Sequence, residues 1–277
     1  MQKTIKGAMF AKMVTSASKL LDCSRDYIDS LNVFPVPDGD TGTNMSLTMQ
    51  SAVKELKACK SNNLSDLADS VSRGALRGAR GNSGVITSQI FRGICAVLKD
   101  YNEVDTKTFA KGLKSATDIA YSAVSKPKEG TILTVCRMIS EHASSICGKT
   151  KDFETFFQEI LAKGEEAVNL TPTLLPVLKK AGVVDSGGAG LMTIYLGFKA
   201  ALDGEEVDAV GDITKQLTAL NDQQQVKPEQ TGAASGATED IEFGYCTETF
   251  ITHLNEGVGQ RDVDNLRSKL MEFGDCV

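Results

Sequence analysis

The amino-acid sequence predicts an all-α fold for residues 1–202, an antiparallel helical bundle or barrel of about eight helices. Two observations support this prediction. Apolar residues recur three and four positions apart in successive segments, whereas the period-two alternation of half-buried strands is nearly absent. Small polar residues of the kind that precede the first turn of a helix also stand before several of these segments.

The helical spacing extends over nine segments. Thr171 precedes Pro172, and proline is well tolerated in the first turn, so the eighth segment is expected to start there. Gly182 is expected to end it, because glycine readily adopts the left-handed conformation common at helix C-termini. In chain order the segments are residues 9–31, 45–56, 67–76, 85–98, 109–124, 132–146, 156–168, 174–180 and 188–201.

The composition changes after residue 202. Residues 203–240 are rich in acidic and polar side chains, and Val226 is the only large apolar residue in the stretch 221–238. Such a segment cannot bury enough apolar surface to fold by itself. We therefore predict an acidic, flexible linker between two domains.

The last part of the chain, residues 241–277, predicts one strand and one helix. Residues 241–252 alternate like a strand. Residues 261–273 form an amphipathic helical pattern with Val263, Leu266 and Leu270 on one face. One strand and one helix cannot bury a core, so this part is interpreted as the incomplete start of a second, α/β domain. Cys246 is interpreted as a core thiol, because His253 alone is insufficient to complete a zinc site with it.

Composition excludes several classes of protein. Of the 277 residues 41% are hydrophobic, which is enough for a sizeable core. The net charge of −6 and the pI of about 5.1 argue against a nucleic-acid-binding protein. No apolar run reaches the length of a membrane span. The seven cysteines are scattered without a Cys-x-x-Cys pair, which is typical of reduced, mostly buried thiols in a cytoplasmic protein.

The most informative stretch is LNVFPVPDGDTGTNM at residues 31–45. Asp38 and Asp40 lie two positions apart, so an extended backbone would point both carboxylates to the same side. Carboxylate and amide oxygens suit a hard cation such as Mg²⁺, which is often shared with the phosphates of a substrate. Asn44 is expected to start a helix whose free N–H groups face an anion.

Three other interpretations of this loop are considered. An EF-hand loop would need glycine in place of Thr43 and glutamate in place of Met49. A phosphatase loop with a nucleophilic aspartate would need glycine directly after Asp40, where Thr41 stands. An ordinary Asp/Gly turn remains an alternative, although such turns rarely need both carboxylates beside amide and hydroxyl groups.

Two further glycine-rich stretches can approach a ligand closely. In GARGNSG, residues 78–84, Asn82 and Ser83 could cap the following helix, contact a phosphate, or do both. Arg80 could meet a transferred phosphoryl group or remain a solvated side chain. In AGVVDSGGAGL, residues 181–191, Asp185 could cap a helix–helix turn or contact a nucleotide.

These three stretches, in this order, resemble the motifs of the dihydroxyacetone-kinase L-type (DhaL-like) domain family, and most closely its bacterial fatty acid kinase branch. The resemblance covers residues 1–202 and, more weakly, the chain from residue 240. It implies an antiparallel α-barrel that binds ATP or ADP at one mouth.

The resemblance also implies the roles of individual residues. Asp38 and Asp40 would be catalytic, and together they would hold two Mg²⁺ ions. Asn32 stands near the place of a third family aspartate, with spacing that differs by about one residue, so it is either a metal ligand or a residue that ends a helix. The residues expected to bind nucleotide or phosphate are Thr43, Asn44, Gly81, Asn82, Ser83, Thr131, Asp185 and Gly187.

The activity that the resemblance implies is transfer of the γ-phosphate of Mg-ATP to a fatty acid carboxylate, a step in phospholipid metabolism. The acceptor would be held by a separate, DegV-like fatty-acid-binding protein, and a homodimer is compatible with the family. A carboxylate is already ionised at pH 7 and needs no general base. The alternatives are a dihydroxyacetone-type kinase subunit with bound ADP as cofactor and a non-catalytic nucleotide-sensing module.

Overall fold

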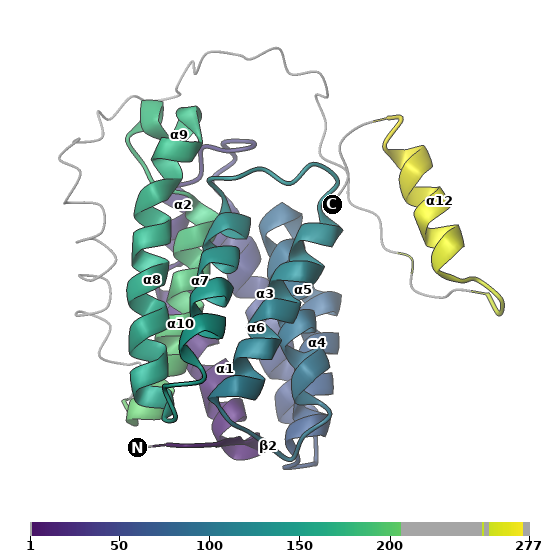
Figure 1. Ribbon diagram of the computed structural model, residues 1–277. Helices are drawn as coiled ribbons and strands as arrows, with labels where there is room; N and C mark the ends of the chain where they lie inside the picture. Colours follow the sequence, from purple (N-terminus) through teal and green to yellow (C-terminus); the bar gives the residue numbers. More distant parts are fainter. Residues whose placement is uncertain (1, 206–250, 252–254, 274–277) are drawn as a thin grey trace.

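The computed structural model describes residues 2–205, 251 and 255–273. Within residues 2–205, eight helices of 15 to 22 residues run up and down the molecule, and two short helices join them at one end (Figure 1). The long helices are α1 (Gly7–Cys23), α3 (Thr41–Ala58), α4 (Leu64–Gly78), α5 (Gly81–Leu98), α6 (Thr106–Ala123), α7 (Ile132–Ile146), α8 (Phe153–Leu174) and α10 (Ser186–Asp203). The short ones are α2 (Arg25–Ser30) and α9 (Pro176–Ala181).

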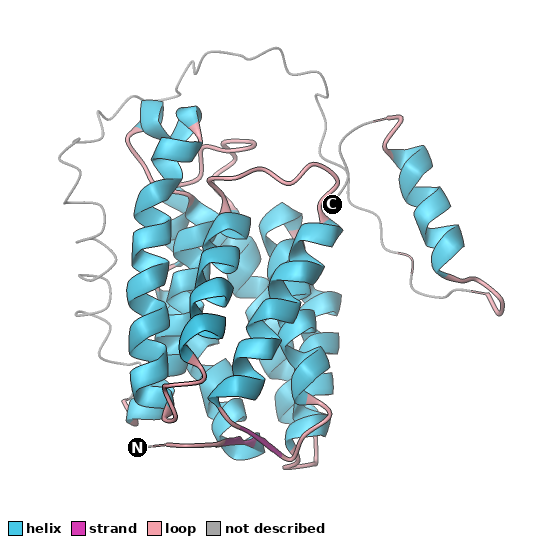
Figure 2. Ribbon diagram, in the orientation of Figure 1, coloured by secondary structure: helices cyan, strands magenta, loops and turns pink. Residues whose placement is uncertain are grey.

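The eight long helices close into a ring. Each packs against the next in the order α1, α3, α4, α5, α6, α7, α8, α10, and α10 returns to pack on α1. Figure 2 shows how little of the described chain is strand. A two-residue pair, β1 (Ile5–Lys6) and β2 (Glu103–Val104), is antiparallel, with Ile5 opposite Val104. The predicted all-α, antiparallel helical barrel of about eight helices is therefore confirmed.

Aromatic side chains fill the end of the barrel where β1 and β2 lie, at the bottom of Figure 1. Phe109 at the start of α6 makes edge or tilted contacts with three phenylalanines at the start of α8, at centroid distances of 5.6 to 6.2 Å. Phe198 near the end of α10 continues the cluster to Phe91 and Phe157. This packed cluster closes one end of the barrel. The three phenylalanines of α8 are Phe153, Phe156 and Phe157, and all are fully buried.

Two predicted helix boundaries are wrong. The predicted helix over residues 9–31 is divided at Ser24 into α1 and α2. The predicted start at Thr171 also fails, because α8 continues through Pro172 to Leu174 and α9 begins at Pro176. Pro172 has no N–H for the carbonyl of Val168, but the Thr171 hydroxyl donates to that oxygen at 2.7 Å instead. Gly182 ends α9 in the left-handed conformation, as predicted.

The C-terminal residues are described only in part. The predicted helix over residues 261–273 is observed as α12 (Gln260–Leu270). Most of the predicted strand, the predicted acidic linker and Cys246 lie outside the described residues. No described helix combines the length and the apolar character that a bilayer crossing needs. The five described cysteines are free, but only Cys95 and Cys136 are buried, so the prediction of mostly buried thiols is wrong for this part of the chain.

The close packing of α5 on α6 generates a testable prediction. A β-carbon added at Gly93 of α5 would lie 2.3 Å from the Cα of Ala116 in α6. We expect Gly93→Ala to lower the free energy of unfolding by about 2 kcal/mol, because the two backbones would have to separate. Urea denaturation measures this change.

Gly112 of α6 is the matched control. A β-carbon there would meet its nearest neighbour, the Cδ1 of Leu98, at 3.4 Å. Gly112→Ala should be neutral or raise the free energy of unfolding by about 0.5–1 kcal/mol, because alanine is the better helix former. Equal destabilisation by the two variants would contradict the backbone-contact explanation.

Candidate functional site

A cleft opens at the end of the barrel opposite the phenylalanine cluster, at the top of Figure 1. Its volume is about 690 Å³. The first turns of four helices line it: α3 with Thr41 and Asn44, α5 with Gly81 to Ser83, α7 with Ile132 and Leu133, and α10 with Ser186 and Gly187. The N-terminus of a helix carries unpaired N–H groups and a partial positive charge. Four such ends around one cleft favour an anionic ligand such as a phosphate group.

The loop between α2 and α3 places two carboxylates at this cleft. Asp38 and Asp40 both line it. Burial raises the pKa of Asp40; the side chain of Asn44 opposes this shift, and the negative charge of Asp38 adds to it. Asn32, buried at the start of the loop, donates its amide N–H to Asp38 Oδ1 at 2.7 Å. The amide of Asn32 therefore orients Asp38, and its own oxygen is the atom that a cation could use.

The two carboxylates fit a divalent cation. None of the ion pairs between described residues includes Asp38 or Asp40. Burial raises the pKa of Asp40 and the charge of Asp38 adds to this, and a bound cation would relieve both effects. Among the described residues, no group of three or more His, Cys, Asp or Glu side chains is arranged to hold a metal ion. A Mg²⁺ ion at this carboxylate pair would thus complete its shell with water, amide or phosphate oxygens, as it commonly does.

The glycine-rich turn before α5 packs directly on α3. Gly81 has a φ of 56°, and a β-carbon there would lie 2.3 Å from the Nδ2 of Asn44. Glycine is therefore required both for the left-handed backbone and for the close approach of Asn44. The Ser83 hydroxyl reaches back to the carbonyl of Thr41 at 3.4 Å. Asn82 lies exposed at the rim.

The predicted helix start at Asn44 is wrong, and the capping alternative for Asn82 and Ser83 is not observed. Helix α3 begins at Thr41, so Asn44 lies in its first turn and does not cap it. Helix α5 begins at Gly81, with Arg80 at the N-cap position, so Asn82 and Ser83 also lie in the first turn. Each helix begins before the residue that the sequence favoured as its cap. Helix α3 begins at Thr41 and helix α5 begins at Gly81. The amide and hydroxyl side chains are thereby available to the cleft.

Asp185 forms the buried wall of the cleft. It caps α10 by accepting the N–H of Gly188 at 2.7 Å, and its own N–H donates to Thr171 Oγ1 at 3.0 Å. Burial raises the pKa of Asp185 to about 7, although the N–H groups of Gly188 and Ile132 lower it in part. The next residue, Ser186, donates to Thr41 Oγ1 at 3.1 Å and links α10 to α3.

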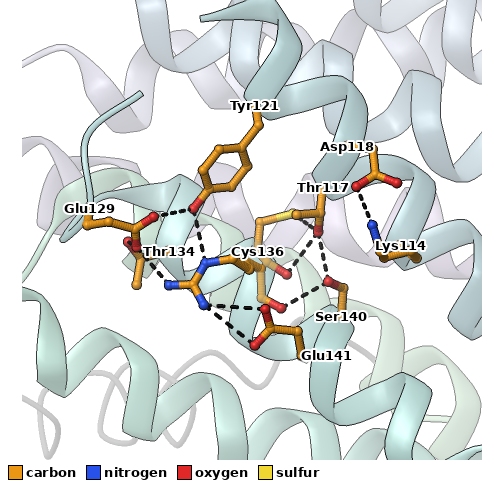
Figure 3. Close-up of polar contacts among 10 residues, drawn as sticks. Lys114, Thr117, Asp118, Tyr121, Glu129, Thr134, Cys136, Ser140 and Glu141 are labelled. Atoms are coloured by element: carbon orange, nitrogen blue, oxygen red, sulfur yellow. Dashed lines mark hydrogen bonds and ion pairs between the residues drawn. The ribbon is translucent and has the colours of Figure 1, made fainter. Parts of the chain in front are cut away.

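The loop between α6 and α7 forms the remaining side of the cleft and carries Lys126, Lys128 and Thr131. Glu129 anchors this loop (Figure 3). It accepts hydrogen bonds from Tyr121 at 2.8 Å, Thr134 at 2.6 Å and Arg137 at 2.8 Å. Burial alone would raise the pKa of Glu129, but these hydrogen bonds together lower it. The loop is therefore held in place by an ionised carboxylate.

Lys128 connects this loop with the loop that carries the aspartates. Its Nζ lies 5.5 Å from the centroid of the Phe34 ring, a distance suited to a cation–π interaction. Lys128, Lys126 and Arg80 are the basic residues in the lining of the cleft. The three sequence motifs themselves contain few cationic residues. The sequence points to Thr131 in this loop by family resemblance but assigns no role to the two lysines.

The structure brings together nearly all of the residues that the sequence singled out. Thr43 is the exception: it is not part of the cleft lining, and its hydroxyl donates to Asp29 Oδ2 at 2.7 Å. Thr41 and Ser186 line the cleft although the sequence analysis did not select them. The residues at the cleft that the sequence selected are Asn32, Asp38, Asp40, Asn44, Gly81, Asn82, Ser83, Thr131, Asp185 and Gly187.

Comparison with protein families agrees with this geometry. The model of the DAK2 domain matches residues 35–200, which include the loop of the two aspartates, the turn before α5 and the start of α10. The chain belongs to the DAK2 domain family. The resemblance to the dihydroxyacetone-kinase L-type domain is thereby confirmed at the level of the family.

The similar curated proteins are about twice as long as this chain. Protein YloV of Bacillus subtilis is 41% identical over 275 residues, which are 99% of this chain and 49% of that protein. An uncharacterized protein of Staphylococcus saprophyticus is 43% identical over 277 residues, 100% of this chain and 49% of that protein. A Staphylococcus aureus protein is 42% identical over 273 residues, 99% of this chain and 48% of its own length.

Solved structures share the fold. The crystal structure of the dihydroxyacetone kinase from C. freundii in complex with AMP-PNP and Mg²⁺ superposes with a TM-score of 0.54 and 16% identity, and covers 73% of this chain and 35% of that one. The native form of the same enzyme gives a TM-score of 0.50 at 18% identity, with the same coverage of both chains. At this identity the likeness concerns the fold alone.

The buried Asp185 predicts a pH-dependent stability. An aspartate in the unfolded chain has a pKa of about 4, so between that pH and about 7 only the folded chain keeps the proton. The stability that this group contributes is complete below the unfolded pKa and is lost as the pH rises through about 7. The stability advantage of wild type over Asp185→Asn should thus fall by about 3 kcal/mol from pH 5 to pH 8, measured by urea denaturation.

Asp152 is the matched control, because it also caps a helix, accepting the N–H of Thr155 at 2.8 Å, but is only partly buried. That hydrogen bond lowers the pKa of Asp152, so the stability that the ionised Asp152 side chain contributes is lost only at acidic pH. Asp152→Asn should change stability by the same amount at pH 5 and pH 8. A pH-independent effect of Asp185→Asn would show that Asp185 is ionised when buried.

Proposed function

We propose that this chain contains the ATP-binding domain of a kinase that transfers the γ-phosphate of Mg-ATP to a fatty acid carboxylate and forms an acyl phosphate. One observation carries the proposal: the N-termini of four helices converge on a cleft that also contains the unneutralised pair Asp38 and Asp40. The cleft volume of about 690 Å³ lies within the range of small-molecule sites, roughly 300–1,000 Å³. Membership of the DAK2 family and the kinase fold of the similar structures support it.

The chain's own groups account for binding of a triphosphate. The first turns of α3, α5 and α10 line the cleft and bring the positive ends of three helix dipoles to it, and Asn44 and Ser83 add side-chain donors beside them. Fixed dipoles of this kind bind charge without having to reorient during the reaction. Arg80 at the rim can contact a phosphoryl group as it leaves the nucleotide. Apolar side chains of Ile86, Val124 and Leu133 provide surface for a flat base.

Asp38 and Asp40 would hold the metal, and Asn32 would orient Asp38 and offer its amide oxygen. When bound, Mg²⁺ supplies positive charge to the phosphate oxygens. The similar dihydroxyacetone kinase was solved with AMP-PNP and Mg²⁺, which favours the same ligands here. A pair of ions would offset most of the combined negative charge of a triphosphate and two carboxylates.

A carboxylate acceptor fits the chemistry of the lining. The described lining residues include no histidine, and both carboxylates of the aspartate loop are assigned to the cation. An ionised acceptor needs no base, whereas a hydroxyl acceptor benefits from one. Following the resemblance to the fatty acid kinase branch, we place the acceptor on a separate fatty-acid-binding protein. The chain spans about half the length of the curated relatives it matches.

A second candidate is a dihydroxyacetone-type kinase subunit, in which ADP is a tightly bound cofactor. The similarity to solved dihydroxyacetone kinases favours it. Exchange of bound nucleotide separates the two candidates. An ATP-dependent kinase exchanges ADP for ATP in every turnover, whereas a cofactor remains bound over many turnovers.

We expect Asp38→Asn and Asp40→Asn each to abolish phosphoryl transfer while the far-UV spectrum and unfolding temperature stay close to those of wild type. Asparagine keeps the size of the side chain but removes the charge that a divalent cation requires. The measurement is the rate of γ-phosphate loss from ATP in the presence of the acceptor and its carrier.

Asp100→Asn is the control for this pair, because Asp100 is an exposed residue outside the cleft lining. It should retain the wild-type rate. More than a tenth of the wild-type rate in both cleft variants would disprove the assignment of the carboxylates to the metal.

The acceptor is tested by acyl phosphate formation. We expect residues 1–277 alone to form no acyl phosphate from free fatty acid, because transfer requires an acceptor oxygen held in line with the γ-phosphate. Addition of a fatty-acid-binding protein to the full-length relative should restore formation. Equal turnover by the chain with free fatty acid and by the full-length protein with its carrier would place the acceptor site within residues 1–277.

A further inference from the structure

The capping of α3 is unusual. Asp40 occupies its N-cap position, yet the Asp40 side chain makes no capping hydrogen bond. An aspartate at an N-cap ordinarily turns its carboxylate back to accept the N–H groups of the second or third helical residue. In α3 these residues are Gly42 and Thr43. A carboxylate engaged in this way would face its own helix and not the cleft.

Asp29 of α2 accepts both N–H groups in place of Asp40. Its Oδ1 lies 2.6 Å from the nitrogen of Gly42 and 3.1 Å from that of Thr43. Its Oδ2 accepts the hydroxyl of Thr43 at 2.7 Å. Both carboxylate oxygens of Asp29 are therefore occupied by the first turn of α3. A residue thirteen positions before Gly42 performs the function of the cap.

Glycine at position 42 permits this arrangement. A β-carbon there would lie 2.4 Å from the carbonyl oxygen of Arg25 and 3.0 Å from the Cβ of Ile28. Both of these residues belong to α2. The absence of a side chain thus lets α2 lie against the start of α3, which brings Asp29 within reach of the two N–H groups.

We propose that Asp29 is a positioning residue for the cation site. Because Asp29 caps α3, the carboxylate of Asp40 is left to face Asp38 and the cleft, where both can bind a divalent cation. This inference rests on the proposed Mg²⁺-dependent function. Without Asp29, the carboxylate of Asp40 turns back to cap its own helix, and the cation loses one of its two charged ligands.

The first test measures stability and requires neither metal nor nucleotide. Thermal unfolding is compared for wild type, Asp29→Ala, Asp40→Ala and the double variant. With Asp29 present, Asp40→Ala should leave the unfolding temperature unchanged or raise it, because Asp40 caps nothing and repels Asp38. With Asp29→Ala in place, Asp40→Ala should lower it by about 3 °C, because Asp40 has become the cap. An equal effect of Asp40→Ala in both backgrounds would overturn the proposal.

The second test measures Mg²⁺ affinity by calorimetric titration in the presence of AMP-PNP. Asp29→Ala should weaken Mg²⁺ binding by about 10-fold or more, the usual effect of removing a group that orients a metal ligand. Asp29→Asn should recover much of the loss, because its amide oxygen can still accept the two N–H groups. An unchanged Mg²⁺ affinity in Asp29→Ala would overturn the proposal.

Asp22 provides the matched control. It accepts the Ser46 hydroxyl and the Gln50 amide at 2.9 Å each, so it also joins α3 to the rest of the barrel, but farther from the cleft. Asp22→Ala should lower stability without weakening Mg²⁺ binding, and an equal loss of affinity in Asp22→Ala would show that the effect of Asp29 is merely structural. If wild type binds no Mg²⁺ with AMP-PNP, the proposed function and the cation role of Asp29 are both overturned. The stability comparison then decides separately whether Asp29 caps α3 in place of Asp40.

Discussion

Four helix N-termini converge on one cleft, and their partial positive charge determines which charged ligands this site can bind. In an up-and-down ring, alternate helices start at the same end, so α3, α5, α7 and α10 all begin at the cleft and direct the positive ends of their dipoles toward it. This concentration of partial positive charge attracts an anion. The aspartate pair on the intervening loop would repel the same anion unless a cation lies between them. The arrangement therefore demands an anionic ligand and a metal together.

The two ends of the barrel differ: one is packed with side chains and the other contains the site. Phenylalanines from α5, α6, α8 and α10 fill one end, and the glycine-rich first turns of α5 and α10 leave the other end open. The loops at the open end are fixed by single carboxylates. Glu129 holds the loop between α6 and α7, Asp185 caps α10, and Asp29 caps α3. Each of these residues orders a wall of the cleft before any ligand arrives.

The sequence predicted the fold because helical periodicity is a local signal. It also predicted most of the cleft, because short motifs such as GARGNSG and DSGG keep their residues together wherever the chain folds. Prediction from the sequence failed where a hydrogen bond joins residues distant in the chain, or where a side chain takes over the usual role of a backbone group. Thr43 looks like a phosphate ligand but bonds to Asp29, and the Thr171 hydroxyl carries α8 through Pro172. Lys126 and Lys128 line the cleft from the loop between α6 and α7, which is distant in sequence from the aspartate loop.

The central claim is that the nucleotide and the metal bind together. Calorimetric titration of the wild-type chain with ATP, with and without Mg²⁺, tests it most directly. We expect Mg²⁺ to tighten ATP binding by at least about 10-fold, which corresponds to about 1.4 kcal/mol. Equal affinity in Mg²⁺ and in a metal chelator would contradict it, because the helix N-termini would then bind the phosphates without the aspartate pair.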